Sequence, residues 1–151
     1  FSSRLSRSLE GAALAARDGR RVRTVPAFDE VNFGCWEGWT RDEIAARDPD
    51  NYRAWLDSKD SFRYPGGESR SAFHARVTAA LGHILTEHAG QHVLMVLHRG
   101  VIASILAELL ALSTAERLAL GIELGSIHVV ARSEDGWRLE CANRIDHLSA
   151  T

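Results

Sequence analysis

The feature that most constrains the fold is a short apolar segment followed directly by a long apolar helix. Residues 92–97 form an apolar run bounded by polar residues, which predicts a strand buried on both faces, as in a parallel sheet. Gly100 then opens a predicted helix over residues 101–112. Such a strand-to-helix turn presents free backbone N–H groups at the carboxyl end of the strand, where α/β proteins bind ligands.

Helix and strand patterns alternate along the rest of the chain. Predicted helices cover residues 5–16, a segment from Thr40 to before Pro49, residues 51–56 and residues 73–90, and predicted strands cover residues 22–28, 126–131 and 137–142. The capping-box spacings at Thr40-Arg41-Asp42-Glu43 and Ser113-Thr114-Ala115-Glu116 each predict a helix start, and Glu134-Asp135-Gly136 is a hairpin signal between the last two strands. This order predicts an α/β protein with three layers, a mostly parallel mixed sheet with helices on both faces.

Length and composition narrow the function classes. A chain of 151 residues suits one domain, residues 1–151, and no stretch approaches the roughly 20 apolar residues that cross a membrane. With a net charge of −2 and a pI near 6.4, we expect no nucleic-acid partner. Cys35 and Cys141 fit no metal or redox spacing, so we expect two reduced thiols in a cytoplasmic protein and no metal site. The sequence is silent on oligomeric state.

Three segments carry candidate chemistry. His98 and Arg99 stand at the strand-to-helix turn, where both can bind phosphate oxygens, and the alternative for His98 is that it only ends the strand. Arg7 lies near the start of the first predicted helix, where it either faces an anion or is an ordinary solvated arginine. Glu30 belongs to a loop with aromatic neighbours and would supply a general acid, unless this is a plain surface loop.

Taken together, these segments resemble the histidine phosphatase superfamily, the phosphoglycerate-mutase-like group, over essentially the whole chain. The matching segments are residues 2–12 (family pattern Ser-Ser-Pro-Leu-x-Arg-Ala-x-x-Thr-Ala), 30–38 (Glu-x-x-x-Gly-x-Trp-Glu-Gly), 65–69 (Pro-x-Gly-Glu-Ser) and 97–101 (the second-histidine motif, usually His-Gly-Gly), with weaker matches at 125–127 and 143–148. Each motif is modest alone, and their shared order makes the resemblance specific.

The resemblance implies a phosphohistidine mechanism without a metal or other cofactor. In this family a first histidine, within Arg-His-Gly, attacks phosphorus, and water then hydrolyses the phosphohistidine. By position, His98 would hydrogen-bond the transferring phosphoryl group beside Gly100, Arg7 would clamp the phosphate, and Glu30 would be the proton donor. These groups suit phosphoryl transfer, which depends on positioning and on neutralising the equatorial oxygens.

The chain departs from the family pattern at several positions. Arg-His-Gly is absent, and the resemblance places it before Phe1 on an inner strand, so we expect an N-terminally truncated domain whose first strand is missing. Arg4 stands where proline is usual, and Gly11 where threonine is usual. Arg99 replaces a glycine, and it would either bind a second anionic group of the substrate or turn outward without a role.

The expected function is a phosphomonoesterase that acts on a small phosphorylated metabolite. The Trp36-Glu37-Gly38 loop looks like those of small phosphatases, including α-ribazole-phosphate phosphatase relatives, and the segment between Gly38 and Glu68 is short for a mutase. Phosphoglycerate mutase is the alternative enzyme. A non-catalytic phosphate-binding or interaction domain is the alternative of another class.

We predict that the 151-residue chain alone shows no phosphatase turnover, because the attacking nitrogen is missing. The measurement is release of p-nitrophenol from p-nitrophenyl phosphate by the purified chain, with a rate equal to that of buffer as the expected result. Substantial turnover that stays with the protein through purification would contradict the prediction.

Overall fold

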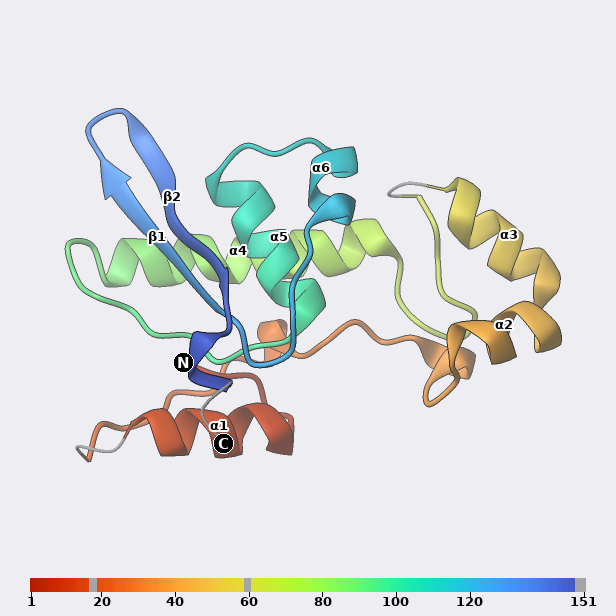
Figure 1. Cartoon of the computed structure of the whole chain (residues 1–151), viewed down its shortest axis with the longest axis horizontal. Coiled ribbons are helices and arrows are strands. Elements are labelled where there is room, and N and C mark those ends of the chain that lie inside the picture. The colour runs from red at the N-terminus through yellow and green to blue at the C-terminus, as the bar shows by residue number, and fades with distance from the viewer. Residues whose placement is uncertain (17–18, 59–60, 149–151) are drawn as a thin grey trace.

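The computed structural model describes residues 1–16, 19–58 and 61–148. Two helices form its centre: α4 (Arg70–Glu87) and α5 (Arg99–Leu109), which cross each other in Figure 1. Their buried side chains share one apolar core, which consists of Phe28, Phe73, Val77, Leu81, Ile84, Val101 and Ile105. Burying each large apolar side chain contributes about 1.5–3 kcal/mol, so this contact is the main support of the fold.

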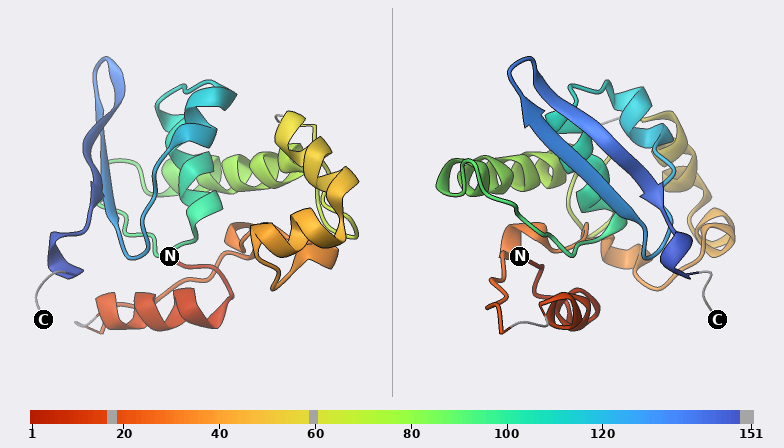
Figure 2. Two further views of the ribbon diagram at one scale, coloured as in Figure 1. Left: turned by 45° about the vertical axis from the view of Figure 1, so that its right-hand side comes forward. Right: turned by 60° about the vertical axis from the view of Figure 1, so that its left-hand side comes forward.

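The remaining elements surround this centre. They are α1 (Ser6–Ala15), η1 (Pro26–Phe28), η2 (Gly34–Trp36), α2 (Arg41–Arg47), α3 (Pro49–Asp57), α6 (Thr114–Ala119), β1 (Ile127–Ser133), β2 (Gly136–Arg144) and η3 (Asp146–Leu148). The pair α2–α3 lies at one end of the molecule and the β1–β2 hairpin at the other, with α1 along one side (Figures 1 and 2). Among the described residues, no helix is long and apolar enough to cross a membrane.

The predicted helix starts are confirmed by the contacts that cap them. Thr40 and Glu43 form a capping box at α2, in which the Glu43 carboxylate accepts the Thr40 N–H at 2.9 Å. Ser113 and Glu116 form the same arrangement at α6, with 2.8 Å for the corresponding bond. Helix α2 ends at Arg47 because Pro49 cannot continue it, and this proline instead begins α3.

Two predicted strands, at residues 22–28 and 92–97, are not regular strands in the structure. Both segments are extended, but they meet residues 1–3 only through isolated parallel bridges, in which Ser2 lies between Thr24 and Val96. The reason is length: Pro26 starts η1 soon after the first bridge, and α1 begins four residues after Ser2. Within the described ranges, the regular sheet is the antiparallel pair β1–β2, so the expected three-layer parallel sheet is not present as a ladder.

The predicted hairpin is confirmed, although both strands are longer than expected. Val130 lies opposite Leu139, and Ser133 opposite Gly136, which leaves a two-residue turn between them. Gly136 has φ +121°, a conformation that favours glycine. An irregularity between Ile127 and Val130 shifts the register at the start of β1.

A second, aromatic core fastens α2 and α3 to the rest of the molecule. Trp36, Phe62 and Tyr64 are buried together, and Trp36 stacks on Phe62 with ring centroids 5.5 Å apart. The Trp36 indole N–H also donates to Asp48 at 2.9 Å. Trp55 of α3 packs edge-on against Trp36 at 6.3 Å, so the position of α3 follows from ring packing.

We predict that the isolated chain self-associates and unfolds with a stability below the roughly 5 kcal/mol of ordinary domains. Leu94, Ile127 and Val129 leave 62%, 37% and 39% of their surface exposed, and the extended segment around Leu94 has an unpaired edge. The measurement is size-exclusion chromatography with urea unfolding. A monomer with one cooperative transition and ordinary stability would contradict the prediction.

Candidate active site

A cavity of about 670 Å³ opens between the start of α1 and the loop after η1. Arg7, the second residue of α1, and Glu30 from the loop both line it. The Arg7 side chain is exposed, and none of the residues that the structure describes gives it a hydrogen bond or ion pair. Arg7 therefore presents an unpaired guanidinium group to a space large enough for a phosphate ester.

His98 is the residue before α5, and only 6% of it is exposed. Its Nε2 atom lies 2.7 Å from the hydroxyl of Ser3, which is fully buried and also accepts the Leu5 N–H at 3.1 Å. Burial lowers the pKa of His98 and the charge of Arg7 lowers it further, while the charge of Glu30 partly opposes them. The imidazole is therefore mostly neutral at pH 7, and both charged groups act on it.

The Glu30 carboxylate occupies the N-terminus of α5. One oxygen accepts the Gly100 N–H at 3.0 Å, and the other accepts the Val31 N–H at 2.9 Å. A Cβ atom on Gly100 would lie 2.5 Å from Glu30 Oε1, so glycine at this position lets the acid approach the helix. This differs from the expectation that the Gly100 amide is open to phosphate, because Glu30 already uses that donor.

The structure brings some of the residues that the sequence singled out together and separates others. Arg7 and Glu30 line one cavity, and the charges of both influence the imidazole of His98, which lines neither cavity. Arg99 and Gly100 line only the second cavity, which they share with Glu30.

Arg76 of α4 holds the loop that carries Glu30, and sequence analysis missed it. Its guanidinium donates to the carbonyl oxygens of Ala27 at 2.7 Å, Asp29 at 2.8 Å and Glu30 at 3.2 Å. It also forms a bidentate ion pair with the Glu68 carboxylate, with N···O distances of 2.7 and 3.0 Å. In an arginine-rich sequence no local pattern marks Arg76, because its partners are a loop backbone and an acid eight residues away.

Two motif segments that are distant in sequence form one unit beside this loop. Asn32 donates its N–H to the Glu68 carboxylate at 2.8 Å, and the Glu68 N–H donates to the Asn32 carbonyl at 3.1 Å. Gly34 has φ +59°, and a Cβ there would lie 2.1 Å from the Pro65 carbonyl oxygen. The glycines in both motifs therefore serve close backbone packing.

Asp29 explains the arginine that stands where the family has proline. Arg4 donates its backbone N–H and two guanidinium N–H groups to the Asp29 carboxylate, at 2.9, 2.9 and 2.6 Å. Burial works to raise the pKa of Asp29, but the hydrogen bonds from Arg4 outweigh it and hold that pKa below its ordinary value. The Arg4 side chain is therefore held by Asp29 of the loop, whereas the Arg7 side chain lines the cavity without such a partner.

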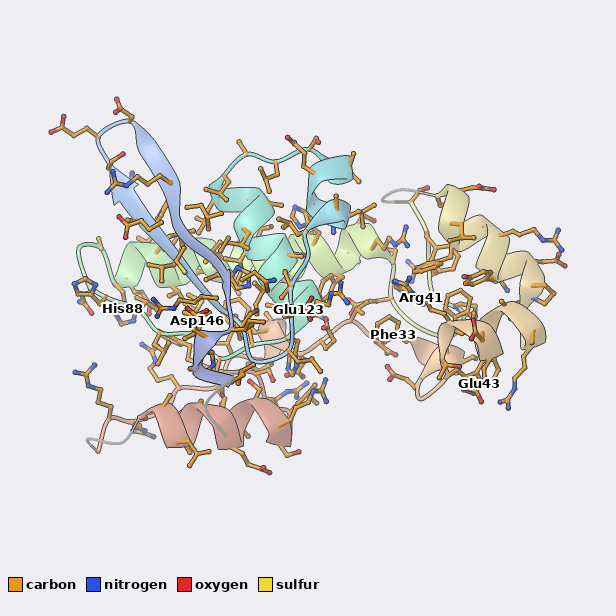
Figure 3. The ribbon with its side chains drawn as sticks, in the orientation of Figure 1. Phe33, Arg41, Glu43, His88, Glu123 and Asp146 are labelled. Carbon is orange, nitrogen blue, oxygen red and sulfur yellow. The ribbon has the colours of Figure 1, made fainter. Side chains whose placement is uncertain are left out.

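A second cavity, of about 530 Å³, lies on the other side of Glu30. Arg99 and Gly100 of α5 form part of its wall, opposite residues of α2 and α3. Figure 3 shows Phe33 and Arg41, two further wall residues, on the side of α2–α3 that faces the central helices. Within the described segments, no cluster of three or more His, Cys, Asp or Glu side chains is arranged to hold a metal ion.

A sequence model of the histidine phosphatase superfamily (branch 1) matches residues 1–145. The chain belongs to this superfamily. It is 29% identical, over 99% of its length, to a metal-independent phosphoserine phosphatase of Arabidopsis thaliana, and 34% identical, over 89%, to a bifunctional protein of Mycobacterium tuberculosis. It spans 63% and 37% of the lengths of these two relatives.

Solved structures of the superfamily show the same fold. A putative α-ribazole-5'-P phosphatase from Escherichia coli superposes with a TM-score of 0.84 at 26% identity, covering 95% of this chain and 71% of that one. A mycobacterial glucosyl-3-phosphoglycerate phosphatase in complex with inorganic phosphate gives 0.78 at 31% identity, with 95% and 75% covered. The family expected from the sequence motifs is therefore confirmed.

We predict that Arg76→Met lowers the free energy of unfolding by about 2–4 kcal/mol, because three carbonyl oxygens and a carboxylate lose a charged donor. Urea unfolding at pH 7 measures the loss, and Arg53→Met on the exposed face of α3 is the control, with an expected change below about 0.5 kcal/mol.

We also predict that Arg76→Met lowers the free energy of unfolding by less in acid than at pH 7. Burial works to raise the pKa of Glu68, but its hydrogen bonds from Arg76 outweigh that effect and lower it. The stabilisation from the ion pair is therefore complete above the ordinary value of 4.5 and disappears as the pH falls through the lowered pKa. An Arg76→Met variant as stable as the parent at pH 7 would contradict the assigned role.

Proposed function

We propose that Arg7, Glu30 and His98 belong to the active site of a phosphomonoesterase that forms a phosphohistidine intermediate on small phosphorylated metabolites. The observation that supports the proposal is that Arg7 and Glu30, far apart in sequence, line one cavity, and that both charges act on the imidazole of His98, the residue before α5. An unpaired arginine, a histidine and a carboxylic acid are the groups that metal-independent phosphoryl transfer needs.

The proposed reaction has two displacements. A nucleophilic histidine nitrogen attacks phosphorus, the bond between phosphorus and the alcohol oxygen breaks, and Glu30 transfers its proton to that oxygen. A water molecule then attacks the phosphohistidine, Glu30 accepts the water proton, and the phosphorus–nitrogen bond breaks to release inorganic phosphate. Arg7 and His98 neutralise the equatorial oxygens in both steps.

The nucleophile is proposed to reside in an Arg-His-Gly segment outside these 151 residues. We place that segment as a parallel strand beside residues 93–97, where it would complete the three-layer α/β/α sheet. Leu94 and Val96 bond to Phe1 on one edge, at 2.8 and 3.0 Å, while the N–H groups of Met95 and Leu97 on the other edge have no partner in the described part of the chain. An extended segment with one free edge can accept a further strand.

The substrate class follows from what named relatives act on. Their names specify phosphoserine, α-ribazole phosphate and glucosyl-3-phosphoglycerate, all of them small phosphate monoesters. We propose a substrate of this class and, because Cys35 and Cys141 are free thiols, a cytoplasmic location.

We predict that, in protein carrying the histidine-bearing segment, His98→Ala and Glu30→Gln each lower kcat/KM for p-nitrophenyl phosphate by about 10²–10⁴-fold, because each removes a group used in the transition state. His92→Ala and Glu10→Gln, at exposed positions away from the cavity, are the matched controls and should leave kcat/KM unchanged. Acid-quenched labelling with ³²P substrate should trap phosphohistidine. Full activity in both site variants would exclude the proposal.

A further inference from the structure

We infer that the second cavity binds the alcohol part of the substrate, and that this part contains a ring and a second anionic group. The inference rests on the proposed function and extends it to the identity of the leaving group. It is carried by the position of Glu30 between two cavities and by the charge and shape of the second one.

Glu30 separates the two cavities. Both are lined by Glu30, Val31, Phe33 and Glu37, whereas Arg7 lines only the first. The proton donor must reach the oxygen that joins phosphorus to the alcohol. That oxygen therefore lies at the boundary, and with the phosphoryl group on the Arg7 side, the alcohol part extends into the second cavity.

The second cavity carries an excess of positive charge. Its wall contains four arginines and two glutamates: Arg41, Arg70, Arg99, Arg117, Glu30 and Glu37. The exposed Arg99 guanidinium has no hydrogen bond or ion pair to any residue that the structure describes. Arg41 lies over the Trp55 ring at 5.5 Å, a contact that uses the face of its guanidinium and not its N–H groups. Both arginines can therefore donate to an anion on the ligand.

The same cavity is lined with flat aromatic surface. Phe33 and Trp39, both half-buried, stand in its wall, and Leu118 and Ile122 add apolar contacts from the opposite side. A volume of about 530 Å³ lies within the usual range of roughly 300–1,000 Å³ for sites that bind whole organic ligands. A two- or three-carbon alcohol would leave most of it empty, whereas a ring would stack on the aromatic walls.

The test compares two aryl phosphates of equal shape, 4-carboxyphenyl phosphate and its neutral isostere 4-carbamoylphenyl phosphate. Dissociation constants come from the tryptophan fluorescence of protein that carries the histidine-bearing segment with its nucleophilic histidine replaced by alanine, which should bind both probes without hydrolysing them. 1,4-Phenylene bisphosphate, added as a third probe, distinguishes a preference for a second phosphate from one for a carboxylate.

We predict that this protein binds the carboxylated probe about fivefold more tightly than the carboxamide at low salt, the ratio that corresponds to about 1 kcal/mol, the upper end for a charge pair between exposed groups. Arg99→Gln should reduce this preference to below about twofold. Arg138→Gln, on the distant strand β2, is the matched control and should leave the preference unchanged.

Equal affinities of the parent chain for the two probes, or a preference that survives both Arg99→Gln and Arg41→Gln, would overturn the inference. With the nucleophilic histidine restored, the same preference should appear as the ratio of kcat/KM for the two probes.

Unphosphorylated 4-hydroxybenzoate and 4-hydroxybenzamide separate this inference from the proposed function, because they lack the phosphoryl group. Their affinities should be the same in the Arg7→Gln variant, which shows that the carboxylate does not bind in the first cavity. Unchanged binding of both aryl phosphates in Arg7→Gln counts against the proposed function alone. Equal binding of the two unphosphorylated probes counts against the inference alone.

Discussion

The candidate site depends on the hydrogen bonds and the ion pair that the Arg76 guanidinium forms. It reaches from the central helix α4 to three backbone carbonyls of η1 and the loop after it, those of Ala27, Asp29 and Glu30, and to the carboxylate of Glu68. A loop lacks the backbone hydrogen bonds of a regular helix or strand, so its carbonyl oxygens need other donors. The planar guanidinium of arginine has enough N–H groups to donate to several of them. Because α4 packs in the apolar core, these hydrogen bonds from Arg76 fix the position of Glu30 relative to that core.

The site combines an unpaired arginine, a neutral histidine and an acid held at a helix start. The Glu30 carboxylate is held by the Gly100 amide, and buried His98 stays mostly neutral beside it. A site arranged in this way has capacity for a dianionic ligand, because Arg7 supplies an unpaired charge and His98 can become protonated as negative charge arrives. The second cavity begins at the same carboxylate, so a ligand that fills both would place its scissile bond at Glu30.

Local sequence signals predicted what local physics determines. The boxes that begin at Thr40 and Ser113 gave the starts of α2 and α6, because capping depends on residues three positions apart. The prediction of a regular strand at residues 92–97 was wrong, because an apolar run does not reveal how long the segments that pair with it are. Arg76 was missed for a related reason: its partners meet it only after the chain has folded. The sequence marks Arg99 as a departure from the family's glycine, but it does not predict the cavity that Arg99 lines, because part of the wall comes from α2 and α3 and no motif specifies their position.

The central claim is that Arg7, Glu30 and His98 surround one oxyanion site, and a crystal structure with tungstate bound tests it most directly. Tungstate mimics phosphate, and its anomalous scattering locates the metal centre without bias from the protein coordinates. The account predicts one strong peak within hydrogen-bonding reach of the Arg7 guanidinium and the His98 imidazole, with the Glu30 carboxylate beside it. Tungstate bound elsewhere, with these three side chains facing separate spaces, would contradict it.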